Sequence, residues 1–203
     1  MKYKSFAILF VSLALVMLSG CSPTEPATAS NNSLALGKLA PDFTLQSSQG
    51  PISLTDFKGK GVVLFFGYTN CPDVCPTGLS TLTQALKQLP KTTQQQLQPI
   101  FITLDPTVDT PTRLAEYLHY FHPNLIGLSS NQQTLKQVTQ AYHVTYKRQP
   151  QPNSEFDFIQ HTAYFYLISS TGKLNQYLPH QSSIENLKQA LTMLVKTKQK
   201  ELI

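Results

Sequence analysis

The sequence has little charge, few cysteines, no tryptophan and no apolar run long enough to cross a membrane. Charged residues make up 13% of the 203 residues, and the net charge of +5 comes from basic residues that are scattered along the chain. Scattered charge forms no basic patch, so we expect no nucleic-acid partner. With 41% apolar residues the composition is globular, and the length suits one domain with a core.

The longest apolar run lies near the N-terminus and is typical of a signal peptide. Lys2 and Lys4 precede residues 6–18, a stretch shorter than the roughly 20 residues that a membrane-spanning helix needs. The run ends in LSGC, which resembles the bacterial lipobox. That resemblance predicts removal of residues 1–20 and a diacylglycerol on the sulfur of Cys21. We therefore expect an extracytoplasmic, periplasmic lipoprotein that is anchored to the membrane. The alternatives are an ordinary secretory signal and an uncleaved anchor.

The segment that begins at Cys21 is predicted to be a tether. Residues 21–39 are polar, contain proline and serine, and show no periodicity, which is typical of a flexible linker. We expect the folded domain over residues 40–199. With Cys21 lipidated, Cys71 and Cys75 are the thiols left to this domain, and they lie in an oxidising compartment.

The hydrophobic pattern predicts alternating strands and helices. An alternating stretch at 43–45 indicates a short strand, and the continuous apolar run 62–66 indicates a central strand covered on both faces. The further predicted elements follow in order: a helix over 79–89, a strand at 100–104, helices at 111–121 and near 131–142, a strand at 144–148, strands at 163–168 and 174–178, and a last helix that begins with a capping box at Ser182 and Glu185. This order predicts an α/β, thioredoxin-like fold with an extra N-terminal strand and an insertion at about 122–160, before the C-terminal ββα half.

Cys71 and Cys75 stand just after the predicted central strand, where open α/β sheets place their functional sites. Cysteines four positions apart lie on the same side of a helix, and a helix N-terminus favours the thiolate. Pro72 and Pro76 limit how this turn can rearrange. The pattern predicts two easily ionised thiols near the surface, serving as a redox dithiol, a metal site or a structural disulfide. A disulfide across so small a loop would stabilise the fold only weakly.

Two families of thiol proteins match the cysteine pair poorly. Thioredoxin-type redox enzymes usually have two residues between their cysteines, and often a tryptophan before the first. This chain has three residues between them and no tryptophan. Peroxiredoxins resemble residues 41–66, but their reactive cysteine usually follows a threonine by three positions, a place that Tyr68 occupies here. The resemblance to peroxiredoxins therefore supports the fold more than the chemistry.

A metal held by two thiolates is better defined with a third ligand, and histidine is the usual partner. His161 directly precedes the predicted strand 163–168, and in a thioredoxin-like fold the loop that enters this strand faces the cysteine helix. We therefore place His161 near the thiols. The other histidines give weaker indications: His119 and His122 at the end of an amphipathic helix, which we expect to be solvated, His143 after an aromatic residue, and His180 in a turn.

Four segments, in the same order, resemble the Sco/SenC family of copper-binding assembly proteins. They are FGYTNCPDVCPT at 66–77, TLDPTVDTP at 103–111, FHPNLIGLSS at 121–130 and QHTAYFYLISSTGK at 160–173, and the resemblance extends from about residue 40 to 195. It implies that Cys71, Cys75 and His161 bind one copper ion, as Cu(I) or Cu(II). The other ring N–H of His161 is expected to find an acceptor in Asp157, Gln160 or a backbone carbonyl.

The resemblance also implies a metallochaperone rather than an enzyme with turnover. Members of this family support assembly of the dinuclear copper centre in subunit II of cytochrome c oxidase, by delivering copper or by reducing the cysteines of that subunit. The implied partners are that subunit or a similar copper protein, a copper donor protein, and the membrane through the lipid on Cys21. The alternative is a thiol–disulfide oxidoreductase with Cys71 and Cys75 as its redox-active pair. Asn70 stands where many members have His or Lys, which affects only the local electrostatics.

Overall fold

The computed structural model describes residues 34–152, 154 and 156–200. The predicted signal peptide, the lipidation site Cys21 and most of the predicted tether lie outside these residues. Within the described part of the chain, no helix combines the length and the apolar character that a membrane span requires.

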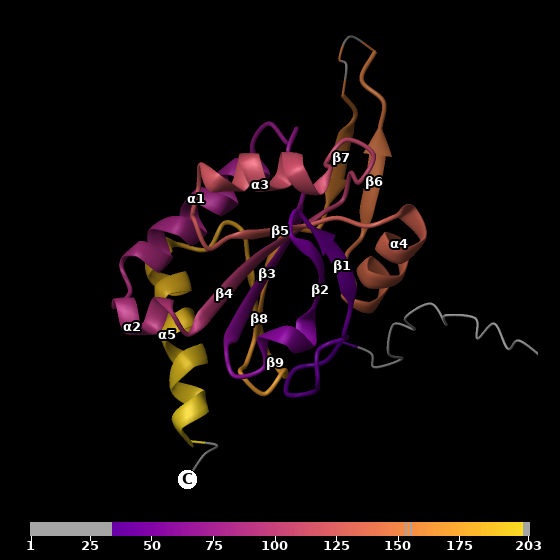
Figure 1. The fold of residues 1–203 in the computed structure, drawn as a ribbon. Coiled ribbons are helices and arrows are strands. Elements are labelled where there is room, and N and C mark those ends of the chain that lie inside the picture. Colours follow the sequence, from indigo (N-terminus) through magenta and orange to yellow (C-terminus); the bar gives the residue numbers. More distant parts are fainter. Residues whose placement is uncertain (1–33, 153, 155, 201–203) are drawn as a thin grey trace, which may run out of the picture.

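The core of the domain is a five-stranded mixed sheet with the strand order β5-β4-β3-β8-β9 (Figure 1). β3 (Gly61–Gly67) and β4 (Leu97–Thr103) lie in the centre, parallel to each other, and every residue of both is buried. β5 (Ile126–Leu128) extends the parallel half, while β8 (Tyr164–Ile168) and β9 (Leu174–Pro179) form an antiparallel hairpin on the other side. This sheet confirms the thioredoxin-like fold that the order of elements predicted.

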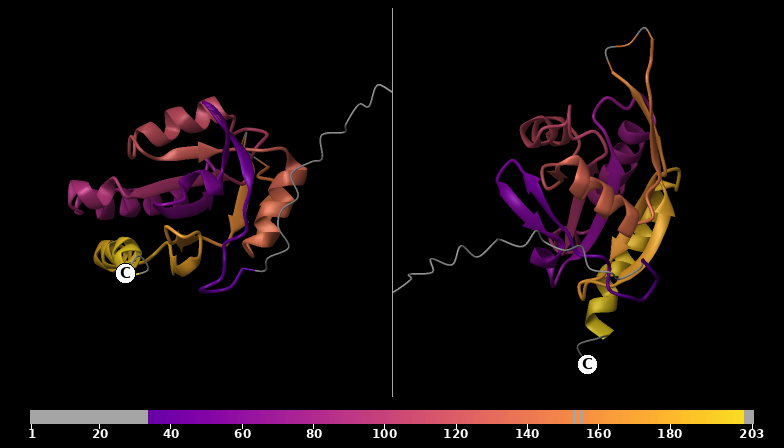
Figure 2. Two further views of the ribbon diagram at one scale, coloured as in Figure 1. Left: turned by 60° about the horizontal axis from the view of Figure 1, so that its bottom comes forward. Right: turned by 90° about the vertical axis from the view of Figure 1, so that its right-hand side faces the viewer.

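Three helices cover one face of this sheet (Figures 1 and 2). α1 (Val74–Lys87) and α5 (Ile184–Lys200) pack against each other, and α5 also contacts β3 and β8. α3 (Pro111–His119) packs against β5. A glycine allows the close approach of α1, because a Cβ on Gly78 would stand 2.8 Å from the ring of Phe65.

An aromatic cluster covers the opposite face. Tyr142 directly follows α4 (Gln132–Ala141), is fully buried, and packs its ring 5.7 Å from the rings of Phe66 and Tyr166. Its hydroxyl donates to the Pro41 carbonyl at 2.7 Å. The hydroxyl of Tyr142 thereby connects the start of the domain to this aromatic cluster.

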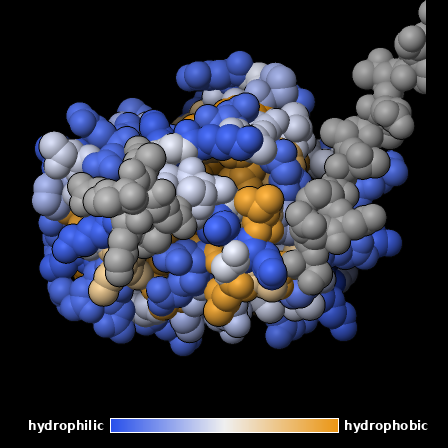
Figure 3. All heavy atoms as spheres, turned by 90° about the horizontal axis from the view of Figure 1, so that it is seen from below, coloured by the Kyte–Doolittle hydropathy of each residue, from blue (hydrophilic) through white to orange (hydrophobic). Residues whose placement is uncertain are grey.

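The predicted N-terminal strand is the first arm of a hairpin. β1 (Thr44–Ser47) pairs antiparallel with β2 (Gly50–Ser53), and the short 3₁₀ helix η1 (Leu54–Phe57) follows. The chain reaches this hairpin past the β8–β9 turn, where the N–H of Ala40 donates to the carbonyl of Gly172 at 2.8 Å. Figure 3 views this end of the molecule and shows hydrophobic residues gathered among hydrophilic ones.

The predicted insertion contains a second hairpin. β6 (Tyr146–Gln149) pairs antiparallel with β7 (Phe158–His161), outside the central sheet. This hairpin extends beyond the rest of the domain at one end (Figure 2). The sequence predicted a strand near β6 but missed β7, because four residues with one buried apolar side chain give no alternating pattern.

The start of the last helix differs from the prediction. α5 begins at Ile184, and Ser183, rather than Ser182, accepts a hydrogen bond from the N–H of Asn186 at 3.2 Å. The predicted capping box was wrong, because two adjacent serines offer the same side chain and only the backbone turn selects between them. A single turn, α2 (Lys91–Gln94), was also not predicted.

Candidate metal centre

The two cysteines lie where β3 ends and α1 begins. Cys71 stands in a turn, with its N–H bonded to the Tyr68 carbonyl at 3.3 Å, and Cys75 is the second residue of α1. The N–H of Cys75 donates to the Cys71 sulfur at 3.4 Å. One of the free N–H groups of the helix N-terminus therefore points at Cys71, an arrangement that stabilises a thiolate there.

Both thiols are more buried than the sequence predicted. Cys71 is 7% exposed and Cys75 is 0% exposed. Cys75 lies so close to the end of β3 that a Cβ on Gly67 would come within 2.6 Å of its sulfur. The prediction of thiols near the surface was wrong, because a helix start read from sequence does not reveal what packs against it.

The two thiols differ in acidity. A hydrogen bond from the Cys75 thiol holds the pKa of Cys71 far below its ordinary value. The same hydrogen bond, together with burial, raises the pKa of Cys75. At neutral pH the pair therefore holds a thiolate on Cys71 and a proton on Cys75. The prediction of two easily ionised thiols is correct for Cys71 alone.

His161, the last residue of β7, lies beside the cysteines as predicted. Its Nε2 is 3.8 Å from the Cys75 sulfur. Its Nδ1 is 3.0 Å from the Thr162 carbonyl, which can only accept, so Nδ1 carries a proton and Nε2 is free to bind a metal. This confirms one of the three expected acceptors, a backbone carbonyl. The ligand atoms of Cys71, Cys75 and His161 lie within 4.8 Å of one another, a grouping that no other Cys, His, Asp or Glu side chains of the described residues repeat.

Tyr68 contacts both halves of this site, a role that the sequence did not indicate. It is 1% exposed, and its ring stands edge-on to the His161 ring with 6.1 Å between centroids. Its hydroxyl accepts a hydrogen bond from the N–H of Ile159 in β7 at 3.1 Å. Burial raises the pKa of Tyr68 to about 12, so its hydroxyl stays protonated near the Cys71 thiolate. Tyr68 thus connects the cysteine turn with the strand that carries His161.

The sequence of this chain is similar to those of known proteins. Residues 32–196 match the family model described as SCO1/SenC. The chain belongs to the SCO1/SenC family. An SCO2-like protein of Rickettsia conorii is 36% identical over 176 residues, which are 85% of this chain and 84% of that protein.

Solved structures of the family have the same fold. The structure of Bradyrhizobium japonicum ScoI with copper bound is 31% identical, with a TM-score of 0.70 over 77% of this chain and 99% of that one. BsSco, described as containing a disulfide switch and as a member of the Sco family of cytochrome c oxidase assembly proteins, is 20% identical. Its TM-score of 0.63, over 82% of this chain and 99% of that one, supports the fold.

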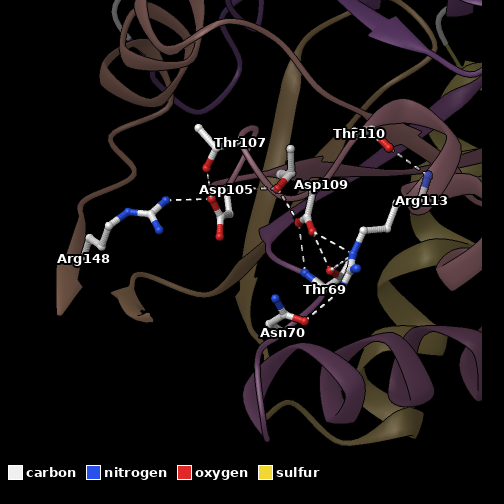
Figure 4. Close-up of polar contacts among 9 residues, drawn as sticks. Thr69, Asn70, Asp105, Thr107, Asp109, Thr110, Arg113 and Arg148 are labelled. Carbon is white, nitrogen blue, oxygen red and sulfur yellow. Dashed lines mark hydrogen bonds and ion pairs between the residues drawn. The ribbon is translucent and has the colours of Figure 1, made fainter. Parts of the chain in front are cut away.

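In this SCO1/SenC chain a buried carboxylate fixes the turn that carries the first cysteine (Figure 4). Asp109 is 0% exposed and accepts hydrogen bonds from the N–H of Thr69 at 2.9 Å, from the Thr69 hydroxyl, and from the Thr103 hydroxyl at 2.6 Å. Arg113 pairs with Asp109 at 3.7 Å and donates to Thr69 and to the side-chain oxygen of Asn70. Sequence reasoning missed these roles; the available signal was an acid shortly after a predicted strand.

One histidine differs from its prediction. His122 is 7% exposed rather than solvated, its Nδ1 accepts from the N–H of Asn124 at 3.2 Å, and burial lowers its pKa. The prediction was wrong because α3 ends at His119 and the chain then turns inward. His119 itself is exposed, as predicted.

Proposed function

We propose that this chain is a copper metallochaperone that holds one copper ion between the sulfurs of Cys71 and Cys75 and the Nε2 atom of His161. The observation that supports this most strongly is the convergence of the three ligand atoms within 4.8 Å. Thiolates are soft ligands that favour Cu(I), and an added imidazole also suits Cu(II). A relative with 31% identity whose structure holds copper supports the choice of metal.

The state of the two thiols fits reversible loading of copper. Cys71 is already a thiolate, and copper binding displaces the remaining proton from Cys75. Oxidation of the pair to a disulfide releases two electrons and the remaining proton, which an oxidant such as a partner disulfide takes up. Two of the three metal ligands are then lost. The redox state of the sulfurs therefore decides whether copper is retained.

We place this function in the periplasm, in assembly of the dinuclear copper centre of cytochrome c oxidase subunit II or of a similar copper protein, with a copper donor protein loading the site. Residues 1–20 would be removed, Cys21 would carry the lipid, and residues 21–39 would tether the domain at 40–199. The start of the domain, at Ala40, contacts the β8–β9 turn, which lies at the end of the sheet opposite the cysteines. A tether attached there leaves the metal site accessible to a partner.

Titration of the reduced protein with Cu(I) in the absence of oxygen tests the proposal. We expect saturation at one ion per chain, with X-ray absorption that reports sulfur and nitrogen ligation. The disulfide form is expected to bind no copper at this site. Undiminished copper binding by a Cys71→Ser, Cys75→Ser double variant would overturn the proposal.

A thiol–disulfide oxidoreductase is the second candidate, favoured by the acidic thiol of Cys71. Cys71 is also the more exposed of the two residues. The Cys71 thiolate would attack a partner disulfide, form a mixed disulfide and displace one partner thiolate. The Cys75 thiol would then lose its proton to a partner thiolate, and its sulfur would displace the second partner sulfur, so that the partner is reduced and this chain is oxidised.

This order of attack predicts different behaviour of the two single cysteine variants. Cys75→Ser is expected to accumulate a mixed disulfide through Cys71, because the second displacement is blocked, whereas Cys71→Ser is expected to trap little or none. Non-reducing electrophoresis after mixing with an oxidised fragment of subunit II measures the trapped fraction. Equal trapping by both variants, or by neither, would contradict the oxidoreductase role.

Replacing Gly67 with alanine is expected to displace the Cys75 sulfur. The new methyl would stand 2.6 Å from that sulfur and 2.9 Å from the Phe101 ring, and overpacking of this kind lowers stability by about 1–3 kcal/mol. Thermal unfolding and copper titration measure the two effects. Gly61→Ala is the matched control: its methyl would meet Leu97 and Leu194 at 3.0 Å, at the end of β3 away from the cysteines, so copper affinity should be kept whatever happens to stability. Unchanged copper affinity in Gly67→Ala would refute the expectation.

A further inference from the structure

The strand that carries His161 belongs to a hairpin outside the central sheet. β7 pairs with β6, and His161 stands opposite Tyr146 in their register. The hairpin extends beyond the domain (Figures 1 and 2). Ile159, 1% exposed, packs its side chain into the core and donates its N–H to Tyr68. The position of the imidazole therefore depends on how this hairpin is held against the rest of the domain.

Arg148 of β6 forms a further tie between the hairpin and the domain (Figure 4). One terminal nitrogen of its guanidinium is 2.7 Å from Asp105, and the other is 3.2 Å from Asp157. The Asp105 side chain is 3% exposed and stands just after β4, where it also accepts from the Thr107 hydroxyl at 2.8 Å. Asp105 raises the pKa of Arg148, as expected for a close ion pair. A buried acceptor just beyond the end of β4 thus binds the outer hairpin.

The Arg148–Asp105 ion pair is suited to holding the hairpin in one position against the domain. The guanidinium is planar and rigid, so it orients the groups that it binds more strictly than a lysine does. Arg148 lies two positions along β6 from Tyr146, the residue opposite His161. A shift of the strand at Arg148 is therefore transmitted to the imidazole. Ligand distances in metal sites agree with their standard values to within about 0.2 Å, so a displaced imidazole is expected to bind the metal less well.

We propose that Arg148 is a positioning residue for His161: by binding Asp105, it holds the β6–β7 hairpin where the imidazole reaches the metal carried by the two sulfurs. The proposal rests on the copper function proposed above. Arg148 acts through the hairpin and is not itself a ligand.

Arg148→Met, compared with Lys147→Met, tests the proposal. Lys147 is the exposed neighbour of Arg148 on the same strand, so its replacement removes the same charge without touching Asp105. In the metal-free protein, Arg148→Met is expected to speed amide exchange at Ile159 and to weaken the nuclear Overhauser contact between the rings of Tyr68 and His161. Exchange in β3 and β4 should stay as in the wild type.

With copper, Arg148→Met is expected to lower affinity several-fold, less than the roughly 10- to 100-fold loss that follows removal of a group bonded directly to a metal ligand. The nitrogen splitting in the electron paramagnetic resonance spectrum of the Cu(II) form should weaken. Lys147→Met should match the wild type in every measurement. Arg148→Lys keeps the charge but loses the two-pronged guanidinium, so it should give an intermediate affinity. If Arg148→Met does not fold, Arg148→Lys replaces it in these measurements.

Coupling through Asp105 is tested by adding Arg148→Met to an Asp105→Asn background, where it should cause little further loss of affinity. Faster exchange with wild-type copper affinity would overturn the positioning role, and so would unchanged exchange and affinity. If the wild type itself binds no copper, the proposed function fails. The Tyr68–His161 contact in the metal-free protein then still decides whether Arg148 positions the imidazole.

Discussion

Replacing His161 with alanine is expected to lower copper affinity by at least about a hundredfold while leaving the fold intact. The imidazole supplies one of the three proposed ligand atoms, and its Nε2 lies 3.8 Å from the Cys75 sulfur. Loss of a partner that only orients a ligand already costs about 10- to 100-fold, so loss of the ligand itself should cost more. His161 is only half-buried at the end of a hairpin, so truncation leaves no large cavity in the core.

Competition with a Cu(I) chelator of known affinity measures this loss, and circular dichroism checks the fold. His119→Ala is the matched control, because His119 is exposed at the end of α3 and belongs to no metal-binding group found among the described residues. Its copper affinity should equal that of the wild type. A His161→Ala variant that keeps wild-type affinity would leave a two-sulfur site and refute the assignment of His161 as a ligand.

Replacing Asp109 with alanine is expected to lower the free energy of unfolding by about 3 kcal/mol or more. The change removes the acceptor for the N–H and hydroxyl of Thr69 and for the hydroxyl of Thr103. Hydrogen bonds to a charged group contribute about 1.5–3 kcal/mol each, and buried donors without partners are costly. The turn that leads into Cys71 also loses its attachment, so copper affinity should fall together with stability.

Thermal unfolding of the reduced, metal-free protein measures the change, and a decrease in Tm of about 6–12 °C is expected for a chain of this length. Asp109→Asn keeps one acceptor oxygen and should lose less. Glu116→Ala removes an acid from the exposed side of α3 and should leave Tm unchanged. A Tm of Asp109→Ala within a degree or so of the wild type would contradict the role assigned to this carboxylate.

The sequence by itself determined the architecture of the core, because the signals involved are local. The apolar run 62–66 predicted a strand buried on both faces, and the spacing of leucines after it predicted α1. These two elements placed Cys71 and Cys75 at the carboxyl end of a central strand. Prediction failed where the signal was short or repeated, as in β7 and at the adjacent serines before α5.

Tertiary structure decided the chemistry of the site. His161 is 86 positions from Cys75, and the two meet only because β8 pairs with β3 and the β6–β7 hairpin turns back toward α1. The unequal acidity of the thiols depends on burial and a shared hydrogen bond. Asp109 binds Thr69 across 40 positions of the chain, and Arg148 binds Asp105 across 43. Contacts between distant residues leave no periodic pattern in a sequence, so packing alone determines them.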